Sequence, residues 1–219
     1  MGSAAIPLVL TLKVAATATA LALVFGVLAG LLLARTRFPG RDAIDAVLLL
    51  PMVLPPTVLG YYLLVVLGSQ GALGGWLDDA FGIRLIFTWQ GAAIASAVVA
   101  FPLVFKGART AFESVDPDLE KAGRSLGYRE WAVLLRITVP LAWRGILAGT
   151  ALCFARAMGE FGATLMLAGN VPGRTQTASL AVYDAVQAGD FPRATALALA
   201  LSVATGAALA LLTRAGSRA

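Results

Sequence analysis

Residues 116–140 read DPDLEKAGRSLGYREWAVLLRITVP, a charged stretch in a chain that is otherwise dominated by Leu, Val and Ala. It contains four acids and four bases, namely Asp116, Asp118, Glu120, Glu130, Lys121, Arg124, Arg129 and Arg136. Asp116 is a suitable helix cap, and Pro117 suits the first helical position, where no backbone donor is needed. Gly127 can end that helix in the left-handed conformation. The stretch therefore predicts a short helix, a glycine turn and a second short helix from about Arg129.

Both short helices are expected to be amphipathic. Leu119, Ala122 and Leu126 recur at the spacing of one helix face, and Trp131 belongs to the second helix, which ends where Pro140 opens the next apolar run. Such helices either dock on a protein partner or lie on lipid headgroups. Equal numbers of acids and bases favour docking, because a helix that binds anionic headgroups is mostly basic.

The composition around this stretch indicates an integral membrane protein. Of 219 residues, 59% are hydrophobic and 13% are charged, whereas about 25% are charged in a typical globular protein. The apolar runs are long and do not alternate, which is typical of membrane-spanning helices. The single cysteine, Cys153, allows no internal disulfide. The absence of histidine excludes imidazole catalysis and histidine ligation of a metal.

Five runs are long enough to cross a bilayer, which takes about 20 apolar residues. They cover residues 6–34, 44–68, 86–108, 141–168 and 192–213. We therefore expect a polytopic all-α bundle of about five spans, forming a single transmembrane domain over residues 1–219. Residues 109–140 are expected to form one long loop within it.

The distribution of the seventeen bases predicts the orientation of these spans. Twelve fall on one side, namely Arg35, Arg37, Arg41, Lys106, Arg109, Lys121, Arg124, Arg129, Arg136, Arg144, Arg214 and Arg218. The opposite loops hold only Arg84, Arg174 and Arg193, while Lys13 and Arg156 lie within spans. Because basic loops stay in the cytoplasm, we expect an external N-terminus, a cytoplasmic C-terminus and a cytoplasmic 109–140 loop.

The charged stretch resembles the "EAA" loop of ABC-importer permeases, which runs E-A-A, three residues, G, nine residues, then I-x-L-P. Lys121, Ala122 and Gly123 occupy the E-A-A position, Gly127 the glycine, and residues 137–140 (ITVP) the closing motif. Lys121, Gly123 and Val139 depart from the pattern, and Glu120 stands one residue before the acidic position. The resemblance implies a coupling helix that is seated in a cleft of a cytoplasmic ATPase. It assigns this role to Leu119, Glu120, Lys121, Ala122, Gly123, Arg124, Leu126, Gly127, Trp131 and Pro140.

Within that segment we expect Gly127 to matter more than any one charge. Glu120 and Arg124 are expected to form exposed ion pairs, which contribute only about 0–1 kcal/mol each.

Three further segments resemble the molybdate branch of these permeases, namely residues 36–51 (TRFPGRDAIDAVLLLP), 48–64 (LLLPMVLPPTVLGYYLL) and 154–177 (FARAMGEFGATLMLAGNVPGRTQT). The last also resembles sulfate permeases. The resemblance implies a type I ABC importer permease that translocates molybdate or tungstate, with a sulfate or thiosulfate permease as the alternative. It implies two copies of an ATPase, an external oxyanion-binding protein, a second copy of this chain and a bacterial or archaeal plasma membrane. ATP and Mg would be used by the ATPase, and neither a cofactor nor nucleic acid is expected to bind this chain.

Polar and helix-breaking residues inside the spans are candidates for the translocation path or a gate. Pro55 and Pro56 break the second span beside Thr57, either at the substrate path or at a packing kink. Arg156 and Glu160, four residues apart, form either a gate or an ion pair that fixes packing. The path or gate set is Pro55, Pro56, Thr57, Arg156, Glu160 and Thr164.

An enzyme and a stand-alone secondary transporter are the competing classes. The sequence contains no G-x-x-x-x-G-K-[ST] loop, histidine or cysteine pair, so it predicts neither an ATP-binding site nor a catalytic constellation. A secondary transporter would need internal repeats and a coupling-ion site. We find no repeat, and Glu160 is the only acid at membrane depth.

Overall fold

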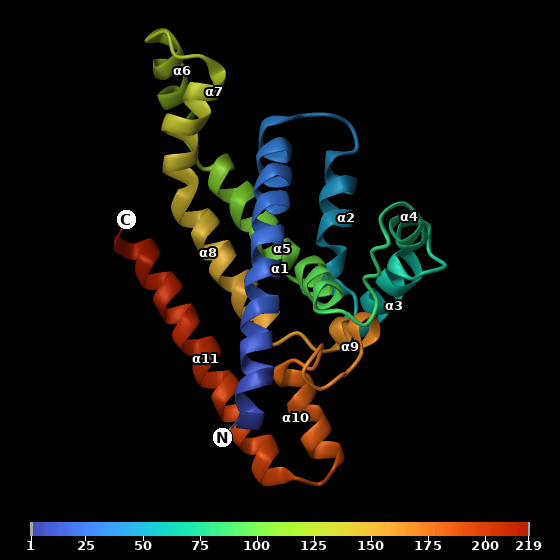
Figure 1. Ribbon diagram of the computed structural model, residues 1–219. Coiled ribbons are helices and arrows are strands. Elements are labelled where there is room, and N and C mark those ends of the chain that lie inside the picture. The colour runs from blue at the N-terminus through green and yellow to red at the C-terminus, as the bar shows by residue number, and fades with distance from the viewer. Residues whose placement is uncertain (1, 219) are drawn as a thin grey trace.

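A computed structural model describes residues 2–218, which are almost entirely helical and contain no strand within that range (Figure 1). The α-helices are α1 (Gly2–Arg35), α2 (Arg41–Val53), α3 (Pro56–Leu67), α4 (Ala72–Phe81), α5 (Trp89–Glu113), α6 (Pro117–Ser125), α7 (Glu130–Val133), α8 (Val139–Met158), α9 (Gly162–Ala168), α10 (Ala178–Gln187) and α11 (Phe191–Arg218). A π-helical turn, η1 (Leu134–Thr138), joins α7 to α8.

The predicted number of spans agrees with the structure. Four continuous helical segments are long and apolar enough to cross a membrane, namely α1, α5, α7–η1–α8 and α11. A fifth span is possible if α2 and α3 count as one bent span, because the two helices meet at an angle of 111°. The helix α10 lies where the sequence predicted only a connecting loop.

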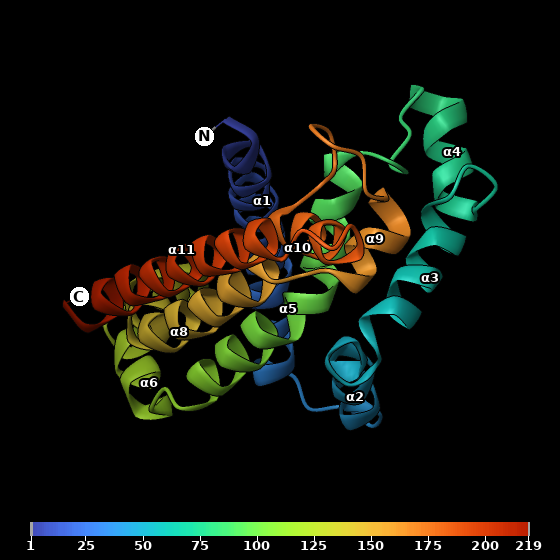
Figure 2. The ribbon, with the colours of Figure 1, turned by 90° about the horizontal axis from the view of Figure 1, so that it is seen from below.

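The centre of the bundle is the contact between α1, α5 and α8, with α11 beside α8 (Figure 2). Small side chains such as Ala18, Ala100 and Ala157 fill the interface between the three central helices. Such residues let helix backbones approach closely in a membrane. The approach is close between α5 and α8, where a Cβ atom on Gly149 would lie 2.8 Å from the carbonyl oxygen of Leu103.

The second predicted span, 44–68, is not one continuous helix. It ends at Val53 and resumes at Pro56, and Pro55 lies between the two halves in an extended conformation. Two successive prolines remove two backbone donors, so the helical hydrogen-bond ladder cannot cross this point. The sequence predicted a break here, but not a turn of 111° that carries α3 out of line with α2.

The fourth predicted span, 141–168, is wrong at both ends. It begins at Glu130, because α7, η1 and α8 form one continuous helix, and Pro140 lies inside that helix instead of opening it. The π-turn accommodates the proline: the amide of Val139 donates to the carbonyl of Leu134, five residues back. At the other end the helix stops at Met158, and the short helix α9 follows.

Candidate coupling site and translocation path

The helices α6 and α7 project beyond the end of α1, at the opposite end of the molecule from α10 (Figure 1). As predicted, Asp116 caps α6 by accepting a hydrogen bond from the amide of Asp118 at 2.9 Å, and Pro117 occupies the first turn. Gly127 adopts a φ of 85°, which confirms the predicted left-handed turn between the two helices. We refer to residues 116–133 as the α6–α7 projection.

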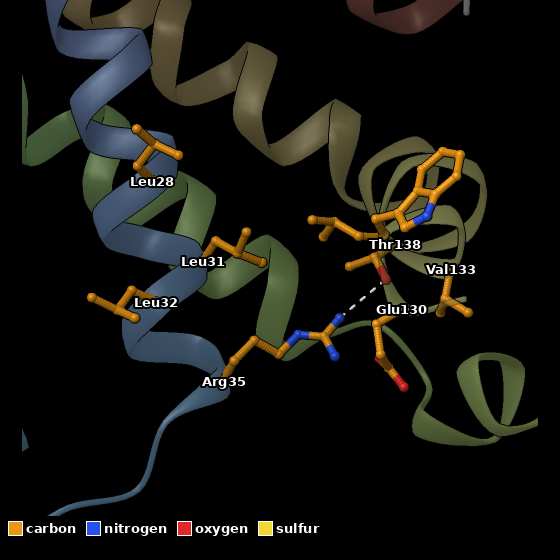
Figure 3. Close-up of a pocket in the computed structure, with 9 residues that line it drawn as sticks. Leu28, Leu31, Leu32, Arg35, Glu130, Val133 and Thr138 are labelled. Carbon is orange, nitrogen blue, oxygen red and sulfur yellow. Dashed lines mark hydrogen bonds between the residues drawn. The ribbon is translucent and has the colours of Figure 1, made fainter. Parts of the chain in front are cut away.

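A partly buried cluster fastens the α6–α7 projection to α1. Arg35, the last residue of α1, donates one hydrogen bond to Oε2 of Glu120 at 2.6 Å and a second, shorter one to Oε1. Thr138 donates to the same carboxylate at 2.6 Å and accepts a bond from Arg35 at 3.0 Å. Figure 3 shows Arg35 reaching from α1 to Thr138. These three residues, the Arg35 cluster, connect α1, α6 and η1.

The charge of Glu120 is stabilised within this cluster. Burial alone would raise the pKa of its carboxyl group. Hydrogen bonds from Arg35 and Thr138, with the positive charges of Arg35 and Arg124, outweigh burial and hold that pKa below its usual value. A carboxylate whose pKa is lowered by folding stabilises the fold above its ordinary pKa and stops doing so only in acid. Glu120 is therefore ionised at neutral pH.

The expected exposure of Glu120 is wrong, because its side chain is only 8% exposed. Its partner Arg35 is 85 residues earlier, so no local pattern marks the pair. Arg124 is exposed as expected, and it pairs mainly with Glu130 at 2.7 Å. Lys121, which replaces the acid of the motif, is exposed and pairs with Asp118 at 2.8 Å.

The inner face of α6 explains one departure from the motif. At Gly123, a Cβ atom would lie 2.5 Å from Cδ1 of Ile137, so an alanine there would require the end of the Ile137 side chain to move. The predicted apolar stripe lies on the outer face instead, where Leu119 is 48% and Leu126 is 78% exposed. Trp131 on α7 is 60% exposed. The α6–α7 projection thus presents large apolar side chains that no described residue of this chain covers.

A second ionic group fastens α2 to α5, and the sequence did not predict it. Arg109 on α5 donates hydrogen bonds to Asp45 on α2 and to Glu113. Arg41, at the start of α2, donates to the same Glu113 at 2.5 Å. Arg41 and Arg109, two of the bases that the sequence assigns to the cytoplasmic side, are thus both paired with carboxylates at this end of the bundle.

An open pocket of about 720 Å³ lies between α1 and the α7–η1 segment, beside the Arg35 cluster. Its walls carry Leu28, Leu31 and Leu32 from α1, and Trp131 and Leu134 from the opposite side. Figure 3 shows the three leucines on α1 above Arg35, with Leu31 pointing toward Thr138. The Arg35 cluster is therefore the main polar bridge across an otherwise apolar junction.

The candidate path residues lie where α3 meets α9. Thr57, just after the proline break, packs against Gly162 at the start of α9: a Cβ atom on that glycine would lie 3.2 Å from the amide nitrogen of Thr57. The contact continues along α3, where a Cβ atom on Gly60 would lie only 2.8 Å from the Cα of Ala163. The breaks in the second and fourth spans are thus in direct contact.

The predicted ion pair between Arg156 and Glu160 is present, with Nη1 2.7 Å from Oε2. The prediction that Arg156 and Glu160 lie on one face of a single helix is wrong, because α8 ends at Met158 and Glu160 lies beyond it. The carboxylate instead caps α9, where Oε1 accepts a hydrogen bond from the amide of Ala163 at 2.9 Å. The Oε2 atom is buried and, despite the close guanidinium, has no aligned hydrogen-bond donor among the described residues. Glu160 thus stabilises the break in the fourth span.

Thr164 makes a buried polar contact, and the loop after α9 contains a separate polar group. The hydroxyl of Thr164 is fully buried and lies 3.5 Å from that of Ser96 on α5. In the loop, Gln176 donates to Asn170 at 3.0 Å and to Asp184 on α10 at 3.3 Å. These loop contacts were not predicted, since they depend on the fold of α10.

The arrangement of helices matches known ABC importers. Over the whole chain and 80% of the other, the fold superimposes with a TM-score of 0.75 and 17% identity on a permease chain of a bacterial alginate ABC transporter, crystallised with an alginate pentasaccharide-bound periplasmic protein. Residues 22–216 match the family described as binding-protein-dependent transport system inner membrane component. The chain belongs to this family.

Curated relatives include molybdenum and sulfate transport system permease proteins. The chain is 48% identical to the molybdenum transport system permease protein ModB of Escherichia coli (strain K12), covering 81% of this chain and 78% of that one. It is 46% identical to the putative molybdenum transport system permease protein YvgM of Bacillus subtilis (strain 168), over 84% and 81% of the two chains. It is 38% identical to the sulfate transport system permease protein CysT of Escherichia coli (strain K12), over 86% and 67%.

Proposed function

We propose that this chain is the permease subunit of an ATP-driven importer for molybdate. The observation that carries the proposal is identity of 46–48% to molybdenum permeases over most of the chain, against 38% to a sulfate permease. The test is uptake of radiolabelled molybdate by vesicles that contain the chain with its ATPase and an external binding protein. Uptake of sulfate with no uptake of molybdate or tungstate would overturn the substrate and favour the sulfate alternative.

The partners follow from the family and from the exposed surface of the α6–α7 projection. We assign to this chain two copies of a cytoplasmic ATPase, which use ATP and Mg. The other assigned partners are an external binding protein and a second copy of this chain. Leu119, Leu126 and Trp131 form an uncovered apolar face on a charged projection, which suits insertion into a cleft of a partner protein. Co-purification of an ATPase with the full chain, lost when these three residues are changed together to serine, tests this assignment.

We expect no ATP hydrolysis by the purified chain alone, because its sequence lacks a phosphate-binding loop. The measurement is phosphate release from ATP by the full-length chain in detergent, before and after the ATPase subunit is added. Turnover above background in a preparation free of other ATPases would contradict the assignment of hydrolysis to a partner.

The orientation is a separate prediction, with the N-terminus external and the C-terminus cytoplasmic. It is supported by the excess of bases in one set of loops, and in Figure 1 the N-terminus lies at the end of the molecule opposite α6. Reporter fusions after Gln70 and Asn170 should be active outside, and fusions after Arg41 and at the C-terminus inside. A cytoplasmic signal at Asn170 would reverse the prediction.

Replacing Gly127 with valine should weaken ATPase docking while the spans still fold. The residue has a φ of 85°, and a β-branched side chain is strained there by roughly 1 kcal/mol or more. No atom lies within 4 Å of a Cβ placed on Gly127, so any loss comes from the backbone and not from a clash. Gly127→Asn is the matched control, because asparagine tolerates the left-handed region. Equal co-purification of the ATPase with Gly127→Val and wild type would show that this turn does not position the α6–α7 projection.

A further inference from the structure

A groove between α2, α5 and α8 carries positive charge that no described residue of its lining neutralises. Its volume is about 820 Å³, and it is lined by Lys106 and Thr110 from α5 and by Arg144 from α8. Asp and Glu are absent from the described residues that line it. Much of the remaining wall is apolar or glycine, including Gly107 and Gly145, so Lys106 and Arg144 are the charged residues of the described lining.

The two cations differ from their neighbours on the same helices. Three residues after Lys106, Arg109 does not line the groove, and its guanidinium is paired with Asp45 on α2 and with Glu113 on α5. For Lys106 and Arg144, by contrast, the structure gives neither an ion pair nor a hydrogen bond to any residue within 2–218. The hydroxyl of Thr110 likewise has no partner in that range and remains able to donate.

Lys106 and Arg144 are both exposed, so each charge can be satisfied by water, by lipid headgroups or by a ligand. A charged side chain inside a membrane segment is costly unless it faces a partner or a wet cavity. Long side chains near a helix end can also extend to the headgroups. In this molecule, however, Lys106 and Arg144 come from different helices and line one groove, a geometry that a shared anion would explain. Charge-assisted hydrogen bonds from ammonium and guanidinium groups to an anionic oxygen are roughly twice as strong as neutral ones.

We propose that Lys106 and Arg144 form a binding position for a small tetrahedral oxyanion, with Thr110 as an additional hydroxyl donor, in the half of the path nearer α6. The groove is open, so an anion held there by two cations and one hydroxyl can leave as well as enter. The identity of the anion rests on the proposed function. The charge and size of the anion are inferred from the groove alone.

The first test measures uptake of radiolabelled molybdate by vesicles containing the complete transporter. Lys106→Gln and Arg144→Gln should each lower the maximal uptake rate about tenfold, which corresponds to ~1.4 kcal/mol. Lys106→Arg and Arg144→Lys retain the charge and should restore most of the rate. Arg37→Gln is the matched control, because it removes an exposed cation from the α1–α2 connection, outside the groove.

Assembly is checked by co-purification of the ATPase with each variant. Wild-type uptake by the assembled Lys106→Gln/Arg144→Gln double variant would overturn the proposal. Equal losses in Arg37→Gln and in the groove variants would also overturn it, since the effect would then belong to net charge and not to this site.

A second test measures charge and access without transport. Thr110→Cys in the assembled complex places a thiol in the groove, and the native Cys153 is buried. An anionic methanethiosulfonate reagent should label Cys at this position at least about tenfold faster than a cationic one, given two unscreened charges. Addition of Lys106→Gln and Arg144→Gln should abolish the preference, and molybdate should slow labelling of the Thr110→Cys variant that retains both cations.

Failure to label with either reagent would mean that lipid or protein fills the groove, and would overturn the proposal. Equal labelling by the two reagents would do the same. The identity of the substrate is tested separately. If the wild-type transporter takes up sulfate and not molybdate, the proposed substrate is wrong, but the site is still supported when Lys106→Gln lowers sulfate uptake.

Discussion

Replacing Glu120 with alanine should reduce recovery of the partner ATPase about tenfold, more than any other single change in the α6–α7 projection. The substitution removes both acceptors for Arg35 and the acceptor for Thr138, so it disconnects α6 from α1. Breaking a fully buried ion pair costs about 3–5 kcal/mol, but the Arg35 side chain is 36% exposed, so we expect about 1–3 kcal/mol. The measurement is co-purification of the ATPase with the full-length chain, together with uptake in vesicles.

A double-mutant cycle identifies the ion pair as the cause. Arg35→Ala should reproduce the loss, and the Arg35→Ala/Glu120→Ala double variant should be little worse than either single variant, because both remove the same interaction. Lys121→Ala is the matched control, since its exposed pair with Asp118 should contribute only about 0–1 kcal/mol. Strictly additive losses, or a loss in Lys121→Ala equal to that in Glu120→Ala, would contradict the role of the Arg35 cluster.

Replacing Gly60 with alanine should abolish uptake and lower the yield of folded protein. The added Cβ would lie 2.8 Å from the Cα of Ala163 and 2.8 Å from the Cβ of Met166, both on α9. These atoms belong to the backbone or its first side-chain carbon and cannot rotate away, so α3 and α9 must separate. Forcing extra atoms into such a contact typically costs about 1–3 kcal/mol. The measurement is the yield of monodisperse protein in detergent, followed by uptake in vesicles.

Gly206→Ala is the matched control for that change. It adds the same methyl group to a helical glycine, but no atom lies within 4 Å of the new Cβ. Because alanine is the better helix former by about 1 kcal/mol, this variant should be at least as stable as wild type. Wild-type yield and uptake from Gly60→Ala would show that α3 and α9 are not held together as closely as the structure indicates.

Local signals in the sequence were sufficient to predict the shape of the α6–α7 projection. Asp116, Pro117 and Gly127 act on their own helix ends, so their positions determine where α6 begins and where the chain turns. The role of Glu120 could not be predicted in the same way, because its partner Arg35 is distant in sequence and the motif itself does not include that arginine. The basic residue at the end of the first predicted span is the sequence signal that could have suggested a partner for Glu120.

The spans show a similar division between what was predictable and what was not. Hydropathy located the membrane segments, because each contains enough apolar residues whatever their backbone does. Hydropathy did not predict the break at residues 159–161. Gly159 and Phe161 are no more polar than the residues of an unbroken span, and no proline lies there. Only the capping of α9 by Glu160, a contact made in the folded chain, defines that break.

The continuous α7–η1–α8 helix has a mechanical consequence. It extends over residues 130–158, from the exposed α6–α7 projection to the break that precedes Glu160. At about 1.5 Å per residue, this rod is roughly 43 Å long. A helix resists stretching along its axis, and here no loop interrupts it. A displacement of α7 along this axis would therefore reach Met158 through one helix, and the π-turn η1 with Pro140 is the place along it where bending is easiest.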